Sequence, residues 1–196
     1  GFPSVEEMVI PKNVRVLRDA FWMMEGLRKV TIRTQKLKEI GDNTFYCCGA
    51  LEDVNLPEGI TRIGQEAFYL NTSLRKINLP STLTRIEYDA FRYDPLEVID
   101  LPAGMTYIGT NAFSNNDELK EVYARPIVPP AADLGYAPKL PFYYSSTRTA
   151  TLYVPKGSAE AYRSSDVFCE FGEIVELEEG EWPTAVGTPT LSPHSY

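Results

Sequence analysis

The feature that most constrains this chain is an internal repeat of about 23 residues. Five phenylalanines mark it at spacings of 24, 23, 23 and 22 residues: Phe21, Phe45, Phe68, Phe91 and Phe113. A Val or Ile stands five residues before each Phe: Val16, Ile40, Ile63, Ile86 and Ile108. One copy has too little apolar surface to fold alone, so successive copies must stack and bury a shared core.

The second half of each repeat alternates apolar and polar residues and predicts a short β-strand. In the second copy, Val54 and Leu56 point to one side, while Asp53 and Asn55 point to the other. Proline cannot donate to a strand ladder and therefore closes the inner copies, at Pro57, Pro80 and Pro102. Stacked copies of such strands predict a parallel sheet with one buried face.

The first half of each repeat, with the pattern Ile-Gly-x-x-Ala-Phe, is expected to turn the chain back. Gly41, Gly64 and Gly109 are predicted to adopt positive φ. The Ala and Phe are expected to fill the core from the opposite side, on a short helical turn. Three residues after Phe, short side chains suited to turns recur: Cys48, Asn71, Asp94 and Asn116. Cys48 is therefore interpreted as a turn residue and not as a reactive thiol.

These residues carry a family resemblance. The stretch from Leu83 to Phe91, followed by Leu96 to Pro102, resembles the BspA-like leucine-rich repeat of bacterial surface proteins, over residues 14–125. Residues 152–162, with 171–175, are similar to the segment that ends such arrays in secreted proteins of gut bacteria. The resemblance implies a right-handed solenoid with a concave sheet, export to the cell surface or beyond, and a role in adhesion or protein recognition.

The expected fold class is an α/β-type repeat solenoid, mainly β, with short helical or irregular convex turns. Residues 1–13 are predicted to be an N-terminal lead-in, residues 14–125 five repeats, residues 126–150 a connecting arm, residues 151–180 a capping unit, and residues 181–196 a tail or linker. The capping-box spacing of Ser4 and Glu7 predicts a helical turn in the lead-in. The capping unit is expected to contain a strand at Leu152–Pro155, a short helix capped by Ser158 and a last strand over 170–177.

The arm is rich in proline and aromatic residues, which favours an extended chain. Its aromatic residues are Tyr136, Phe142, Tyr143 and Tyr144. One interpretation is that these rings cover the open end of the last repeat. The alternative is an aromatic platform for a sugar or a peptide.

Composition narrows the classes of function. The net charge of −8 disfavours nucleic-acid binding. The sequence contains no apolar run of the ~18 residues that a membrane span needs. The chain opens with Gly1 and not with Met, which we interpret as the removal of a signal or lipoprotein anchor. The family resemblance, and not this opening, implies an extracellular or cell-surface location.

The sequence predicts no catalytic residue, cofactor or metal site. Three cysteines and one histidine lack the spacing of metal ligands. There is no phosphate-binding loop and no nucleophile elbow. Asp53 and Asp100 are the pair considered for acid–base chemistry. Two strand spacings of ~4.8 Å would hold them roughly 10 Å apart, slightly beyond the range of glycosidases.

A binding module is the leading prediction. The outward strand positions form a grid of candidate ligand-binding residues on the concave face: Lys29, Thr31, Arg33, Asp53, Asn55, Lys76, Asn78, Val98, Asp100, Glu121 and Tyr123. The first rows are basic and the last are acidic, which favours a protein partner of complementary polarity. Three alternatives stay open: solvated positions without a ligand, a glycan held by the aromatic arm, and a structural spacer in a larger surface protein.

Overall fold

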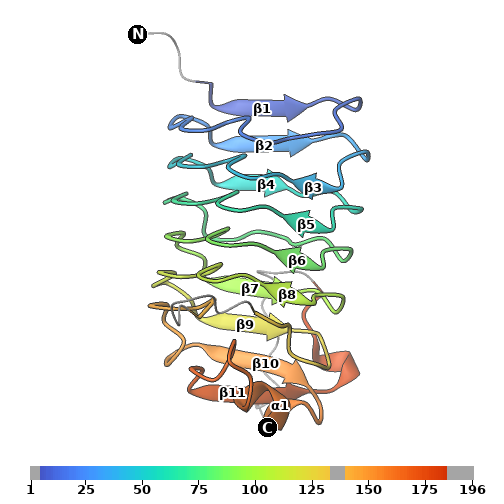
Figure 1. Cartoon of the computed structure of the whole chain (residues 1–196), viewed down its shortest axis with the longest axis vertical. Helices are drawn as coiled ribbons and strands as arrows, with labels where there is room; N and C mark the ends of the chain where they lie inside the picture. Colours follow the sequence, from blue (N-terminus) through green and yellow to red (C-terminus); the bar gives the residue numbers. More distant parts are fainter. Residues whose placement is uncertain (1–4, 133–139, 185–196) are drawn as a thin grey trace, which may run out of the picture.

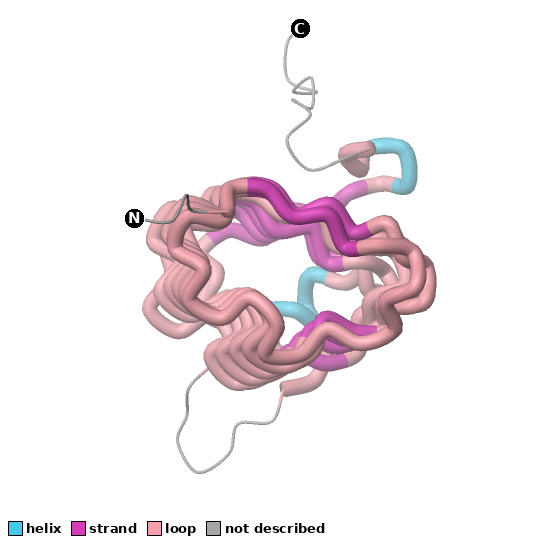
Figure 2. The backbone as a smooth tube through the Cα atoms, turned by 90° about the horizontal axis from the view of Figure 1, so that it is seen from above, coloured by secondary structure: helices cyan, strands magenta, loops and turns pink. Residues whose placement is uncertain are grey.

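The computed structural model describes residues 5–132 and 140–184, and these form a solenoid of stacked coils (Figure 1). Viewed along the stack, the coils lie almost on top of one another around a common core (Figure 2). The architecture is mainly β, with parallel sheets and little helix, as the repeat pattern predicts. Each coil hydrogen-bonds to the next, so the repeat length sets the register of the stack.

The predicted strands form one wall of the solenoid, which we call the strand wall. Its first sheet has the order β1-β2-β4, and its second has the order β11-β10-β9-β7, with every pair parallel. The strands are β1 (Glu7–Ile10), β2 (Lys29–Ile32), β4 (Asp53–Asn55), β7 (Val98–Leu101), β9 (Glu121–Ala124), β10 (Thr151–Pro155) and β11 (Glu173–Leu177). Between the two sheets, a single bridge joins Lys76 to Val98.

A third parallel sheet, which the repeat pattern did not predict, runs along another side of the solenoid in the order β3-β5-β6-β8. Its strands are two residues long: β3 (Glu39–Ile40), β5 (Arg62–Ile63), β6 (Arg85–Ile86) and β8 (Tyr107–Ile108). Each ends on the repeated Ile, which is fully buried. The strands are too short to show an alternating pattern in the sequence.

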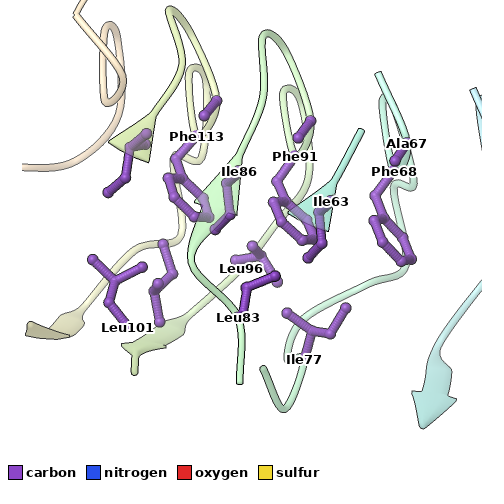
Figure 3. Close-up of a cluster of buried hydrophobic side chains, with 14 of the residues drawn as sticks. Ile63, Ala67, Phe68, Ile77, Leu83, Ile86, Phe91, Leu96, Leu101 and Phe113 are labelled. Atoms are coloured by element: carbon purple, nitrogen blue, oxygen red, sulfur yellow. The ribbon is translucent and has the colours of Figure 1, made fainter. Parts of the chain in front are cut away.

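The repeated phenylalanines form a continuous column inside the solenoid. Neighbouring ring centroids from Phe21 through Phe113 lie 5.0 to 5.4 Å apart, which is the range of stacked aromatic pairs. Figure 3 shows Phe68, Phe91 and Phe113 in this column, with Ile77, Leu83, Leu96 and Leu101 packed around them. Phe142 extends the column, with its centroid 5.1 Å from that of Phe113. The arm thus supplies a core residue that covers the last repeat.

The first coil differs by one residue from its prediction. Val16, placed in the Ile position by its spacing from Phe21, is 71% exposed, whereas Leu17 is buried. The amide of Gly41 donates to the carbonyl of Leu17, just as that of Gly64 donates to Ile40. Leu17 therefore holds the Ile position, because the turn before Phe21 is one residue shorter.

The prediction of positive φ at Gly41, Gly64 and Gly109 is wrong, because the described glycines with positive φ are Gly59 and Gly157. The repeat glycines are required for close approach of neighbouring coils. A Cβ on Gly64 would lie 2.6 Å from the backbone N of Asp42, and a Cβ on Gly41 would lie 2.3 Å from the carbonyl O of Leu17. No side chain fits at those distances.

The phenylalanine turns are irregular, and the prediction of helical turns there is wrong within the described residues. Each of the five repeat turns instead has a left-handed residue two positions before Phe and another two positions after it, and the turn at Phe142 has only the second. Those before Phe are Asp19, Asn43, Glu66, Asp89 and Asn111; those after it are Met23, Cys47, Leu70, Tyr93, Asn115 and Tyr144. Two reversals per turn point Phe inward while its flanking residues point out.

A ladder of short polar side chains lies beside the phenylalanine column. The Oδ1 of Asn71 accepts from the amide of Cys48 (3.1 Å), and the Oδ1 of Asp94 accepts from the amide of Asn71 (2.7 Å). The Nδ2 of Asn116 donates to the carbonyls of Phe91 and Phe113. Each polar residue thus satisfies backbone groups of its own coil or a neighbouring coil, as predicted for this turn position.

Asp94 is the exception in this ladder. Its carboxyl group is fully buried, and Oδ2 has no hydrogen-bond partner among the described residues. Burial raises the pKa of Asp94 well above its usual value. Asp94 therefore places a carboxyl group in a position where Asn71 and Asn116 of the neighbouring coils carry amides.

The ends of the chain continue the strand wall. Glu7 begins β1, so the predicted helical turn is wrong over the described part of the lead-in, while Ser4 lies outside the described residues. In the capping unit, β10, the helix α1 (Ala159–Arg163) after Ser158, and β11 confirm the predicted elements. A 3-10 helix η1 (Glu179–Glu181) follows β11. The division of the chain into five segments stays a prediction.

Candidate functional site

The outward side chains of the strand wall line up in columns. Lys29 lies opposite Asp53 and Thr31 opposite Asn55, while Val98 lies opposite Glu121 and Asp100 opposite Tyr123. The residues between them, such as Val30, Val54 and Ile99, are buried. The alternation therefore directs the predicted grid away from the core.

Most charges in these columns are paired between neighbouring coils. Lys29 Nζ lies 3.2 Å from an oxygen of Asp53, and Arg28 Nη2 lies 2.9 Å from Glu52. In later coils, Glu97 accepts from both Arg75 and Lys120. The predicted change from basic to acidic rows is thus broken into local ion pairs. Exposed pairs of this kind each contribute only ~0.2–1 kcal/mol.

Asn55 serves the backbone. Its Oδ1 accepts from the amide of Ile32 (2.7 Å) and its Nδ2 donates to the Ile32 carbonyl (3.3 Å). The side chain thereby completes the ladder at the point where β4 ends. This engagement leaves Asn55 little capacity for a ligand.

Residues 178–184, which we call the C-terminal strap, cross the strand wall beside Tyr123 and Arg125. Arg125 forms a bidentate ion pair with Asp100 (2.6 and 2.7 Å) and donates to the carbonyl of Pro183 in the strap (2.8 Å). The guanidinium also lies over the ring of Trp182, 5.1 Å from its centroid. The hydrogen bonds to Asp100 raise the pKa of Arg125. This effect outweighs the burial of the guanidinium, which alone would lower the pKa.

Tyr123 lies beneath the same strap. Its ring stacks on Tyr153 at 4.6 Å and meets the edge of Trp182 at 6.5 Å. Only 5% of Tyr123 is exposed. The structure therefore places Asp100 and Tyr123 in a packed cluster and not on an open surface.

Sequence reasoning missed Arg125 and Trp182. Leu101 pairs with Ala124, so Arg125 stands where Pro102 closes the preceding copy. The sequence did offer one signal for Arg125, because an arginine stands there in place of the proline that closes the inner repeats. Trp182, by contrast, lies outside the repeats, and its position over Arg125 follows from the tertiary path of the strap.

A part of the strand wall remains open. We define the open face by the outward residues whose side chains make no hydrogen bond or ion pair within the described residues: Thr31, Arg33, Lys76, Asn78 and Val98. A hollow of about 590 Å³ adjoins Lys76 and Val98, where the wall has only its single bridge. A second hollow of about 670 Å³ lies between Asn78 and Trp182. The open face thus ends at the strap.

The arrangement shows no acid–base pair at Asp53 and Asp100, because each carboxylate belongs to a separate ion pair. Within residues 5–132 and 140–184, no group of three His, Cys, Asp or Glu residues is placed to hold a metal. Burial raises the pKa of Cys48 to about 11, and its Sγ lies 2.9 Å from the carbonyl O of Phe21. This thiol is protonated at neutral pH, which supports its interpretation as a turn residue.

No helix in the described parts of the chain has the length and apolar character that crossing a membrane requires.

The aromatic arm is divided by the structure. Phe142 is buried in the core, whereas Tyr144 is 67% exposed and its ring centroid lies 4.0 Å from that of Tyr143. Tyr136 lies outside the described residues. Among the described aromatic residues of the arm, Tyr144 is therefore exposed to a ligand, with half-buried Tyr143 beside it.

Comparison with known proteins agrees with this architecture. The model of a family described as "BspA type Leucine rich repeat region" matches residues 2–120 in six copies, and so includes the lead-in before the five predicted repeats. No curated protein matches the chain.

Solved structures are also similar. A leucine-rich repeat protein from Bacteroides ovatus matches with a TM-score of 0.60 and 22% identity, over 90% of this chain and 47% of that protein. The chain thus spans about half the length of that relative. A leucine-rich repeat protein of T. pallidum matches with a TM-score of 0.61 and 25% identity, over 84% of this chain and 80% of that protein.

Proposed function

Because the chain belongs to the BspA-type leucine-rich repeat family, we propose that it is a non-catalytic module that recognises a protein partner through its open face. Proteins of this family are typically secreted or displayed at the bacterial surface. We extend that location to this chain as part of the proposal. Adhesion to another protein would then be its role.

One observation carries the proposal. Arg33 and Lys76 lack partners in the described structure, whereas Lys29, Arg28 and Arg125 are each paired with a carboxylate. Unpaired cations beside Thr31 and Asn78 leave hydrogen-bonding capacity directed at solvent. The open face is therefore suited to an acidic patch on a partner, even though the whole chain has a net charge of −8.

Charge reversal tests the proposal. The double variant Arg33→Glu/Lys76→Glu is compared with Arg148→Glu, which changes an exposed arginine outside the strand wall. Binding is measured against a panel of purified extracellular matrix proteins at two salt concentrations. We expect a slower association rate and weaker salt dependence for the double variant alone, because charges at an interface steer encounter. An unchanged association rate in the double variant would contradict the proposal.

Exposed Tyr144, with the half-buried ring of Tyr143 beside it, supports a glycan as the second candidate ligand. A glycan array probed with the unmodified chain and with a Tyr143→Ser/Tyr144→Ser variant distinguishes the two classes. Signal lost in that variant but retained after charge reversal would assign binding to the arm. A chain that binds neither class would act as a structural spacer.

A further inference from the structure

The turns that carry the phenylalanines place a line of apolar side chains on the outer surface of the first four coils. We call this line the aromatic ridge, and it consists of Trp22, Met23, Tyr46, Cys47, Tyr69, Leu70 and Tyr93. Trp22 is 60% exposed and Met23 57% exposed, Leu70 and Tyr93 are less exposed, and the other three residues are half-buried. These residues directly follow the core phenylalanines, so the turn that buries each Phe displays its neighbours.

The ridge is continuous along the solenoid. The ring centroids of Trp22 and Tyr46 lie 6.1 Å apart, those of Tyr46 and Tyr69 lie 5.0 Å apart, and those of Tyr69 and Tyr93 lie 5.6 Å apart. Contiguous exposed apolar surface of this kind marks interaction sites, whereas scattered apolar residues do not. Tyrosine, tryptophan and methionine are also the residues enriched in protein interfaces.

Folding does not explain the apolar residues of the ridge. Met23, Cys47, Leu70 and Tyr93 have φ between 56 and 64°. The left-handed conformation costs roughly 1–2 kcal/mol for most residues, and asparagine adopts it more readily. Asn115 occupies the same position in the fifth coil with φ of 60°. Polar asparagine would therefore serve the turn better, and the apolar side chains require another reason.

The ridge already holds one arginine of its own chain. The guanidinium of Arg92 lies 4.7 Å from the centroid of the Tyr93 ring, and its Nη2 donates to the Tyr93 hydroxyl at 3.1 Å. Over residues 5–132 and 140–184, no other ring of the ridge carries such a cation. Tyr93 thus shows the chemistry that the remaining rings offer.

The rim of the ridge is acidic. Glu25 and Glu66 act electrostatically on Cys47, and both raise the pKa of its thiol after the larger effect of burial. Burial, followed by the charge of Asp89, raises the pKa of Glu66. Arg92 already acts in the opposite direction and lowers the pKa of Glu66, and a further cation at this rim would relieve the remaining repulsion between Glu66 and Asp89. A second copy of the chain would add carboxylates instead, which disfavours self-association.

We propose that the aromatic ridge docks a protein segment that presents arginine side chains between apolar residues. The apolar residues would contact Met23 and Leu70, and the guanidinium groups would lie against Trp22 and between Glu25 and Glu66. This surface is separate from the open face of the strand wall. The chain would then bind an acidic partner on one side and a basic partner on the other.

Tryptophan fluorescence tests the proposal directly. The chain has two tryptophans, so Trp182→Phe leaves Trp22 as the only reporter. The probes are two synthetic peptides of alternating leucine and arginine, or of alternating leucine and glutamate. We expect the arginine peptide to cause a saturable change in Trp22 emission that weakens with salt, and the glutamate peptide to cause none.

A ridge variant completes the test on the same background. Met23→Asn/Leu70→Asn removes apolar side chains at left-handed positions, so it is expected to fold at least as well as the parent. Its dissociation constant for the arginine peptide is expected to rise about tenfold or more. Arg33→Glu/Lys76→Glu is the matched control and should leave this binding unchanged, which keeps the result independent of the open face.

Three outcomes would overturn the proposal. The first is the absence of a saturable change with the arginine peptide. The second is equal binding by the parent and by a folded Met23→Asn/Leu70→Asn variant. The third is a dimer, measured by light scattering, that dissolves in this variant, because the ridge would then be a self-association surface.

Discussion

Replacing Asp94 by asparagine should stabilise the protein at neutral pH. The substitution keeps the shape and the Oδ1 acceptor for the Asn71 amide, and it replaces the unpartnered Oδ2 with a donor. Asn71 and Asn116, in the same position of neighbouring coils, use Nδ2 to donate to the carbonyls of Phe68 and Phe113. The new amide is expected to do the same.

The magnitude follows from proton binding. The pKa of Asp94 is raised in the folded chain, so above the unfolded pKa the folded state binds more of this proton than the unfolded chain does, and stability falls as the pH rises. Each unit by which the folded pKa exceeds the unfolded one costs ~1.4 kcal/mol once the pH is above both values. We therefore expect Asp94→Asn to add at least about 1 kcal/mol at pH 7, which corresponds to a rise of ~2–4 °C in Tm.

The pH dependence identifies the cause. Wild-type stability from this group is complete below the unfolded pKa, near 3.8, and is lost as the pH rises toward the folded pKa. The gain from Asp94→Asn should therefore be near zero at pH 3 and should grow as the pH rises. Urea unfolding at several pH values measures it.

The matched control is the reverse exchange in the preceding coil. Asn71→Asp adds a second buried carboxyl and should destabilise the protein at pH 7, by an amount that shrinks at low pH. A gain from Asp94→Asn that is equal at pH 3 and pH 7 would refute the reasoning. A loss at pH 7 would show that the carboxyl is held ionised and stabilised by its surroundings.

Three further predictions concern the core and the thiols. Phe91→Ala should cost ~3–5 kcal/mol and lower Tm, because it removes a fully buried ring from the column; an unchanged melting curve would contradict the assigned register. Gly64→Ala should destabilise the protein, since its Cβ would lie 2.6 Å from the Asp42 backbone N, whereas Gly180→Ala, with open space around it, is the neutral control. A thiol reagent at pH 7 should modify exposed Cys169 quickly and buried Cys48 only on unfolding, which mass spectrometry of the native protein can check; equal rates would disprove the burial of Cys48.

The repeat pattern was sufficient to predict the stack and its core. Phe68 and Phe91 recur at one spacing, and only stacked coils bury side chains that recur in this way. The roles of the glycines were not predictable from a single coil, since Gly64 is required by the neighbouring chain at Asp42. Left-handed turn residues such as Leu70 also escaped prediction, because apolar side chains are not typical of that conformation.

The sequence by itself determined the solenoid, the inward residues of each coil and the outward grid of the strand wall, because these follow from local periodicity. Only the tertiary structure decided which part of that grid is open. Arg125 and Trp182 are 57 residues apart, yet their contact closes the wall over Asp100 and Tyr123. The tertiary structure also aligned Trp22, Tyr46 and Tyr69 into one ridge. Both surfaces depend on contacts between coils, which the pattern of one repeat does not contain.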